Sequence, residues 1–478
     1  MADQMVQPKF TVNGGGEIEI GLTRKPVSPW GGLALFAAFG EAIGLRKAVE
    51  TALAGVCRTS PNALPCADLY LGFLVGVLTG ASRFLHLERL RADAVLKRLF
   101  GLSRFVAPTT YARFFQSLTG QAREDAWASL VSWTLALLPA RQEGYVLDID
   151  STVVERCGEQ EGALQGYNPR KRGGMTHHPV LAGLAECRVI LHGWLRSGNA
   201  TSGDNVVAFL AECLGLAKDR VTLSYLRADS GFFDKRILDF LEDQHLLYIV
   251  KAPFTKYVSL AARQAGEWVD LGDGLAVAEA RIKLVRWTRE RRLVLIRHSV
   301  KERRNPQGKL LPDIEEYRFQ AIVTSFSVEA MDAAAVYRSY LPRGEFENRI
   351  KELKQGCGLN GFCMEDFSAT ESLLRVLCLV HNLIQVFQDK IGMRPADRPK
   401  KEGERHTLET LRNTLFTCAA VLGRRGRQVM LRLSTTEAWL GRFEQALARL
   451  LPAPAKCRAV LESAARRDVL QPALLFDG

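Results

Sequence analysis

The sequence predicts a mixed α/β protein in which a strand-rich core lies between helical regions. Two changes of pattern along the chain support this prediction. Residues 31–138 repeat their apolar positions at spacings of three and four, as amphipathic and buried helices do. From Tyr145 onward, short apolar segments with the length of strands alternate with helical ones, and residues 252–327 are mostly strand-like.

The order of elements in the core is informative. We expect strands at residues 145–150, 180–187, 189–196, 221–228 and 246–251, and helices at residues 204–217 and 235–244. Three strands, a helix, a strand, a helix and a strand is the order of an RNase H-like core. The strand-like residues 252–327 then form a β-rich insertion, after which a long helix is expected at residues 342–355.

The charge of the chain favours a polyanionic partner. The formal net charge is +12, from 64 Lys and Arg against 52 Asp and Glu, and basic surface attracts phosphate over long distances. A basic protein without such a partner is an equally good interpretation of charge alone. Residues 92–100, followed by a helix that opens at Pro108, resemble a helix-turn-helix, although an ordinary helical bundle has the same pattern.

Cysteine usage and hydropathy indicate a reducing compartment. The ten cysteines include no CxxC pair, and several lie in apolar helical segments, so we interpret them as small buried side chains. We see no signal peptide, and the longest apolar run, near residues 69–81, is shorter than the roughly 20 residues needed to span a bilayer. We therefore expect a cytoplasmic protein with no membrane partner.

Two carboxylates follow apolar strands and are candidates for chemistry. Asp150 ends the strand at residues 145–150, and Asp229 follows the strand at residues 221–228. A charge at the end of a buried strand is costly unless it is paired, and parallel neighbouring strands would bring the two acids together. A turn-capping role is the alternative for each. Asp148 competes with Asp150 as the first acid, because residues two apart lie on one face of a strand.

A polar face on the helix after the insertion supplies a third carboxylate. Tyr340, Arg343, Glu347 and Lys354 are spaced so that they fall within an arc of roughly 60° on one helix face. The apolar residues of the helix form a separate stripe, which can be buried while the polar face points to the sheet edge. A solvated face, with Glu347 paired to Arg343 and Lys351, is the alternative.

These residues resemble a known family. Tyr340, Arg343, Glu347 and Lys354 match the Tyr-Arg-Glu-Lys signature of DDE insertion-sequence transposases. The segments at residues 160–163, 166–171, 226–233 and 344–354 are similar to the IS-thirteen-eighty-like branch and occur in the family's order. The resemblance is specific over residues 148–354 and weaker towards both ends. One departure is His177 next to His178, where the branch has an aromatic residue before the histidine.

The resemblance implies a mechanism and a site. Asp150, Asp229 and Glu347 would be the catalytic acids and would hold two magnesium ions, for which manganese could substitute. Asp150 is preferred to Asp148 because the acid followed by Ser-Thr is the matching position. The phosphates beside the cut would be held by Tyr340, Arg343 and Lys354.

Two further DNA contacts are expected outside the acid site. The basic loop with Arg170, Lys171 and Arg172 would meet the DNA backbone, although a solvated loop would have the same composition. Related transposases stack an aromatic residue of the insertion on a flipped base, which makes Trp287 a candidate. Packing inside the insertion is the alternative for Trp287.

Together these expectations describe a DNA transposase. We predict a mainly helical DNA-binding domain at residues 1–140 and a catalytic domain at residues 141–251 and 328–392. The β-rich insertion would span residues 252–327, and a basic C-terminal helical region residues 393–478. The partners would be double-stranded DNA, as element terminal inverted repeats and as target, and a second copy of the chain. The family implies a bacterial, nucleoid-associated endonuclease that also joins strands. The alternatives are a domesticated DNA-binding protein and a plain RNase H-like nuclease without strand transfer.

Overall fold

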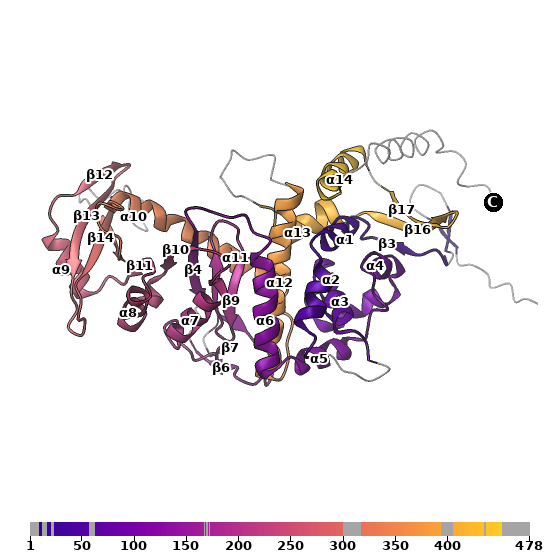
Figure 1. The fold of residues 1–478 in the computed structure, drawn as a ribbon, viewed down its shortest axis with the longest axis horizontal. Helices are drawn as coiled ribbons and strands as arrows, with labels where there is room; N and C mark the ends of the chain where they lie inside the picture. The colour runs from indigo at the N-terminus through magenta and orange to yellow at the C-terminus, as the bar shows by residue number, and fades with distance from the viewer. Residues whose placement is uncertain are drawn as a thin grey trace, which may run out of the picture.

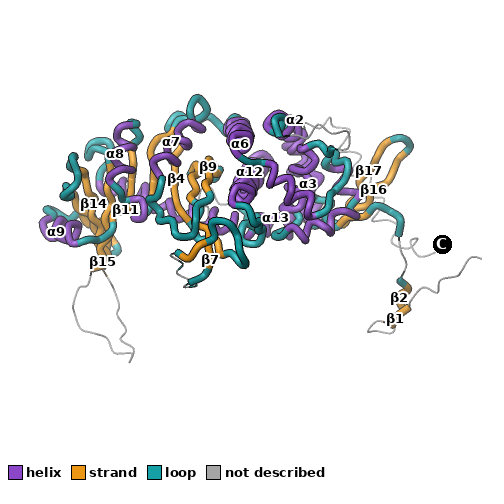
Figure 2. The backbone as a smooth tube through the Cα atoms, turned by 90° about the horizontal axis from the view of Figure 1, so that it is seen from below, coloured by secondary structure: helices purple, strands orange, loops and turns teal. Residues whose placement is uncertain are grey.

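The structure is a computed structural model, and it describes residues 9–11, 17–20, 23–56, 63–166, 168, 171, 173–299, 317–392, 405–434 and 436–451. The molecule is elongated, with a helical half, a central sheet and a strand-rich end arranged along its long axis (Figure 1). The tube view from below shows the same division, with the helical half on one side of the central strands and the strand-rich end on the other (Figure 2).

Six α-helices make up most of the N-terminal region. They are α1 (Leu33–Ala42), α2 (Leu45–Ala52), α3 (Cys66–Leu78), α4 (Ala94–Leu99), α5 (Pro108–Ser117) and α6 (Gly120–Leu135), with a 3-10 helix η1 at Phe84–Ala92. Three short strands precede them, β1 (Lys9–Thr11), β2 (Glu17–Glu19) and β3 (Val27–Ser28). The buried face of α3 is almost wholly apolar, which explains why this helix is covered by its neighbours on nearly all sides.

A nine-stranded sheet forms the middle of the molecule and one of its ends. Its order is β12-β13-β14-β15-β11-β10-β4-β8-β9. The strands are β4 (Tyr145–Ser151), β8 (Val180–Leu184), β9 (Ile190–Trp194), β10 (Leu223–Ala228), β11 (Leu247–Ala252), β12 (Val269–Gly272), β13 (Leu275–Ile282), β14 (Arg291–Ser299) and β15 (Tyr317–Thr324).

The five strands of the core occur in the expected order along the chain. β4 pairs in parallel with β10, and β10 in parallel with β11, while β8 and β9 continue antiparallel on the other side of β4. Helices α7 (Val206–Ala217) and α8 (Lys235–Asp243) connect these strands, and the 3-10 helix η2 (Ser230–Phe232) follows β10. This arrangement fits the RNase H-like core that the sequence predicts.

The strands after residue 252 lengthen the core sheet. β15 pairs antiparallel with β11, and β14, β13 and β12 follow outward. Helix α9 (Lys256–Gln264) connects β11 to β12. The free edge of β11 would otherwise expose a row of unpaired backbone groups, and β15 satisfies them. The insertion is therefore continuous with the sheet that carries the candidate acids.

The helices after the insertion return to the core. α10 (Ala333–Tyr340), a 3-10 turn η3 (Leu341–Arg343) and α11 (Gly344–Gln355) follow one another without a gap. The helix expected at residues 342–355 corresponds to the end of η3 and to α11, and α10 is a further helix before it. A small sheet of β5 (Val154–Glu155), β7 (Met175–His177) and β6 (Leu164–Gln165) lies beyond the end of β4.

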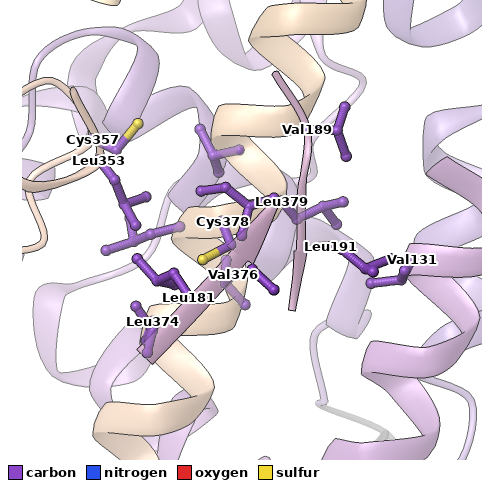
Figure 3. Packing of buried hydrophobic residues seen from close by; sticks show 14 of the residues in the cluster. Val131, Leu181, Val189, Leu191, Leu353, Cys357, Leu374, Val376, Cys378 and Leu379 are labelled. Carbon is purple, nitrogen blue, oxygen red and sulfur yellow. The ribbon is translucent and has the colours of Figure 1, made fainter. Parts of the chain in front are cut away.

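Helix α12 (Phe367–Ile391) is the central packing element. It is the one helix among the described residues that is long and apolar enough to cross a membrane by length and composition, and 89% of that window is buried inside the protein. Its Leu374 and Cys378 pack near Leu181 of β8 (Figure 3). The Asn382 side chain accepts from the N–H and donates to the C=O of Ile190, at 2.7 and 2.8 Å, and so satisfies the backbone of this residue in the edge strand β9.

The described part of the C-terminal region contains two strands as well as helices, so it is less helical than expected. α13 (Leu408–Leu411) and a π-helical turn (Arg412–Phe416) lead to a hairpin of β16 (Ala419–Arg425) and β17 (Gln428–Ser434), followed by α14 (Glu437–Leu450). Gly426 lies at the hairpin turn with φ 59°, a conformation that glycine adopts without strain. β16 also pairs with β3, so the N-terminal strand supplies a partner that no local pattern reveals.

Candidate active site

Asp150 and Asp229 are brought together by the pairing of β4 with β10. Ile149 and Ala228 are the last partners in this parallel pairing, and the two acids are the residues that directly follow them. The Asp150 side chain is 11% exposed and that of Asp229 is 38% exposed. The two acids therefore lie side by side at the carboxyl edge of the sheet, where one of them is nearly buried.

Backbone amides fix one oxygen of each of these acids. The Ser151 N–H donates to Asp150 Oδ1 at 2.8 Å, and the Gly231 N–H donates to Asp229 Oδ1 at 2.9 Å. Each carboxylate is held in orientation by this bond, and its Oδ2 is left for another partner. The second oxygens of both acids are thus directed at a common point.

Glu347 reaches the same point from the first turn of α11. The helix is fastened to the sheet by its buried Phe346 and by Arg349, whose guanidinium donates to the carbonyls of Leu184 and Ala185 at 3.0 and 2.7 Å. The Glu347 side chain remains 62% exposed. The acid site is therefore buried on the Asp150 side and open to solvent on the Glu347 side.

The Arg343 guanidinium lies among all three carboxylates. Its Nη2 is 3.0 Å from Asp150 Oδ2 and 3.9 Å from Asp229 Oδ2, and its Nη1 donates to Glu347 Oε1 at 2.8 Å. The structure thus brings the three predicted acids together around one cation. The predicted alternative pairing of Glu347 with Arg343 also exists, as one part of this cluster.

Burial sets the protonation of the innermost acid. Removal from water raises the pKa of Asp150 to about 7, an effect that Arg343 opposes and that the neighbouring Asp229 reinforces. Close carboxylates hinder one another's ionisation, so this group of acids gains from any cation placed between them. Arg343 is that cation here.

The donor set of the site suits a hard divalent ion. Carboxylate oxygens are the ligands that magnesium prefers, and Asp150 Oδ2, Asp229 Oδ2 and Glu347 Oε1 converge. In the part of the chain that the structure describes, no group of three or more His, Cys, Asp or Glu is close enough to hold a metal as it stands. In this structure the guanidinium of Arg343 contacts all three acids.

Asp148, the rival first acid, has a different partner. The Arg227 guanidinium donates to both of its oxygens, at 2.7 and 2.8 Å, and both residues are buried. Arg227 Nη1 also donates to the Ser339 carbonyl at 2.7 Å. Asp148 is thus occupied by a two-pronged ion pair that ties β4 and β10 to the end of α10, which favours Asp150 as the acid of the site.

Tyr340 and Lys354 flank the acids. Burial raises the pKa of Tyr340 to about 12, with further influence from Arg343 and the three acids, so its hydroxyl stays protonated near neutral pH. Lys354 Nζ donates to Thr152 Oγ1 at 3.2 Å and to the Val153 carbonyl at 2.6 Å, just beyond Asp150. Both residues of the predicted signature therefore lie beside the site.

Of the other predicted DNA contacts, the structure describes Lys171 and Trp287. Lys171 is exposed in its loop, while Arg170 and Arg172 are outside the described residues. Trp287 is 7% exposed, its ring centre lies 5.4 Å from that of Phe233, and the Arg291 guanidinium lies 4.5 Å from the ring centre. Stacking on a base would require the Trp287 ring to leave this packing, so that role stays a prediction.

Two serines beside the acids were not predicted. Ser151 and Ser202 share a hydroxyl hydrogen bond of 2.9 Å, and Ser202 lies against Gly231, where an added Cβ would come within 2.8 Å of it. The Arg196 guanidinium donates to three carbonyls of the loop that carries Ser202. The glycine two residues after Asp229 was the available signal, since glycine often marks a close approach of two segments.

Comparison with known proteins places the chain in a family. A solved structure of the piggyBac transposase synaptic complex with hairpin DNA is similar over 95% of this chain and 89% of that chain, with 11% sequence identity and a TM-score of 0.39. No curated protein matches the sequence. The family model described as Transposase DDE domain group 1 matches residues 10–455, and the chain therefore belongs to the DDE transposases.

Proposed function

We propose that this transposase binds the ends of its mobile element, cleaves them and joins them to target DNA. The observation that carries the proposal is the convergence of Asp150, Asp229 and Glu347 on one cation at the carboxyl edge of the sheet. Family membership supports transposition as the biological setting. The Tyr-Arg-Glu-Lys residues support an insertion-sequence transposase of the IS-thirteen-eighty-like branch.

The three acids would hold two magnesium ions, or manganese in their place. When bound, the metals supply activation of the attacking water or 3′-hydroxyl and stabilisation of the departing oxygen. The chain supplies the positions. Asp150 and Asp229 are oriented by backbone amides, and Glu347 is oriented by a helix fastened to the sheet. The geometry of the reaction is thus set by strands and a helix.

The residues around the acids would hold the DNA phosphates. Lys354 offers an ammonium beside the end of β4, and the protonated Tyr340 hydroxyl offers a hydrogen bond. Arg343 offers a planar guanidinium, which suits two phosphate oxygens at once. Lys171 would contact the backbone farther along, and the net charge of +12 favours such contacts. Two DNA ends must be held together for transposition, so we propose a homodimer on DNA in the cytoplasm.

The test uses three single substitutions and a matched control. Asp150→Asn, Asp229→Asn and Glu347→Gln should each abolish metal-dependent cleavage of a labelled element end while leaving DNA binding in place. Glu345→Gln is the control, because Glu345 is exposed on the same helix and pairs with Arg188, away from the acids. Substantial cleavage by any of the three purified variants would remove that residue from the site.

A plain nuclease without strand transfer is the competing function. The same acids would serve both reactions, so geometry does not separate them. An element end that is already cut, supplied with target DNA, removes the need for cleavage and reports joining alone. Joined product that requires all three acids supports a transposase, whereas cleavage of intact ends without any joining supports the nuclease.

A further inference from the structure

The position of Arg343 against the Oδ2 atoms of Asp150 and Asp229 leads to a regulatory inference. Oδ1 of Asp150 and Oδ1 of Asp229 each accept a backbone N–H group, and the Oδ2 atoms of both acids face Arg343. Arg343 Nη2 lies against both Oδ2 atoms, at 3.0 and 3.9 Å. A metal at the acids and the guanidinium in this position would therefore compete for the same oxygen atoms.

We propose that Arg343 is the resident counter-cation of the acids, and that metal binding releases it to a DNA phosphate. This inference rests on the proposed function, since it assumes that the acids bind metal and that the site receives DNA. The Arg343 side chain would then have two positions. In the absence of metal Arg343 neutralises the carboxylates, and in the loaded complex it contacts the phosphate beside them.

The surroundings of Arg343 suit such a change of position. Its side chain is 7% exposed among the acids, yet its Nε has no hydrogen-bond partner, so its hold on the site is incomplete. Glu347 and Asp229 are 62% and 38% exposed, which leaves the solvent side of the site open to the guanidinium. An arginine that gives up carboxylates for a phosphate keeps charge-assisted hydrogen bonds in both positions.

The consequence is that metal and DNA favour each other's binding. A phosphate that draws Arg343 away frees the acid oxygens for metal, and a metal that displaces Arg343 frees the guanidinium for phosphate. Coupling of this kind is reciprocal, so each ligand must raise the affinity for the other by the same factor. The affinity for a DNA end would then be highest when metal is bound at the acids.

The experiment measures Mn²⁺ binding to the full-length protein by electron paramagnetic resonance, with and without a duplex that carries an already cut element end and no target DNA. In the wild-type protein the DNA should tighten Mn²⁺ binding by roughly 5- to 150-fold, the usual range for coupled sites. Arg343→Gln should bind Mn²⁺ more tightly than wild type without DNA, and the tightening by DNA should shrink. Metal bridging by the phosphate alone would instead preserve the full coupling in this variant.

Two further variants complete the design. Arg343→Lys keeps a positive charge but offers one nitrogen in place of a fork, so its Mn²⁺ affinity should fall between those of wild type and Arg343→Gln, and it serves if the glutamine variant does not fold. Lys351→Gln is the control, because Lys351 is exposed on α11 and should leave both affinities unchanged. Without metal, Arg343→Gln should unfold at a lower temperature than wild type. Mn²⁺ should raise the unfolding temperature of Arg343→Gln by more than it raises that of wild type.

The outcomes separate this inference from the proposed function. If Glu347→Gln binds as much Mn²⁺ as the wild-type protein, or if neither binds any, the acids do not form the metal site and both proposals are wrong. If that binding exists but neither Arg343 variant binds Mn²⁺ more tightly than wild type without DNA, only the counter-cation role is overturned.

Discussion

Replacement of Asp148 by Asn tests whether the buried acid beside the site is structural. The carboxylate of Asp148 accepts two hydrogen bonds from Arg227, at 2.7 and 2.8 Å. The Asp148 and Arg227 side chains are 0% and 4% exposed, so solvent does not screen the pair. The substitution removes the negative charge and leaves the guanidinium of Arg227 buried with one neutral partner.

The cost follows from the burial. Breaking a buried pair by removing one partner costs about 3–5 kcal/mol of unfolding free energy, because the remaining charge is uncompensated. Arg227 also donates to the Ser339 carbonyl at the end of α10, directly before Tyr340. The loss should therefore loosen the helical segment that leads to Glu347 as well as the two strands.

Thermal unfolding and Mn²⁺ binding together give the assay. Asp148→Asn should unfold at a clearly lower temperature, while Asp150→Asn should unfold near the wild-type temperature but lose Mn²⁺ binding. The double variant Asp148→Leu with Arg227→Met should recover much of the stability, since well-packed apolar residues often replace a buried ion pair without loss. An Asp148→Asn protein as stable as wild type that no longer binds Mn²⁺ would make Asp148 the first acid and refute the reasoning.

Three further outcomes are expected. Lys354→Ala should weaken binding to a cut DNA end and lower the slope of log affinity against log salt by about 1, whereas Lys351→Ala should not; an equal effect of both would remove the phosphate role. Trp287→Ala should lower the unfolding free energy by about 3–5 kcal/mol in denaturant titrations, because its buried ring packs on Phe233; unchanged stability would favour the base-stacking role. Burial, and then neighbouring arginines, lower the pKa of His381 to about 3, so the unfolded chain binds a proton below pH 6.5 that the folded chain excludes. Stability should therefore fall as pH drops from 6.5 towards 3, by up to about 1.4 kcal/mol per pH unit, and a His381→Gln variant should show a flatter pH profile.

The sequence alone was sufficient to locate the two strands that lead to Asp150 and Asp229. Apolar runs of strand length ended at Asp150 and just before Asp229, and both strands are central in the sheet. Central strands are covered on both faces, so their sequences are apolar throughout and easily located. Helical spacing placed Glu347 on a face separate from the apolar stripe that packs on the core, and the resemblance to the Tyr-Arg-Glu-Lys signature singled it out on that face.

Partners distant in the sequence could not be predicted. The spacing of Arg343 and Glu347 indicated a pair, but the approach of Arg343 to Asp150 depends on how α11 crosses the sheet. The bond from Arg227 to Asp148 joins residues 79 positions apart, and no periodicity records such a contact. In the C-terminal region, β16 takes β3 as a partner from the other end of the chain, so its strand character depends on tertiary pairing as much as on local sequence.

The sheet also connects the insertion to the acid site. β11 lies between β10, which leads to Asp229, and β15 of the insertion. Arg291 of β14 is buried and bonds Asp239 and Glu242, which belong to α8, the helix that follows Asp229 and η2. Trp287, between β13 and β14, packs on Phe233, which directly follows η2. A buried arginine between two carboxylates is stable only while both sides stay in place, so the insertion and the segment after Asp229 hold each other. The position of Asp229 is therefore fixed from two directions, by β4 within the core and by the strands that extend it.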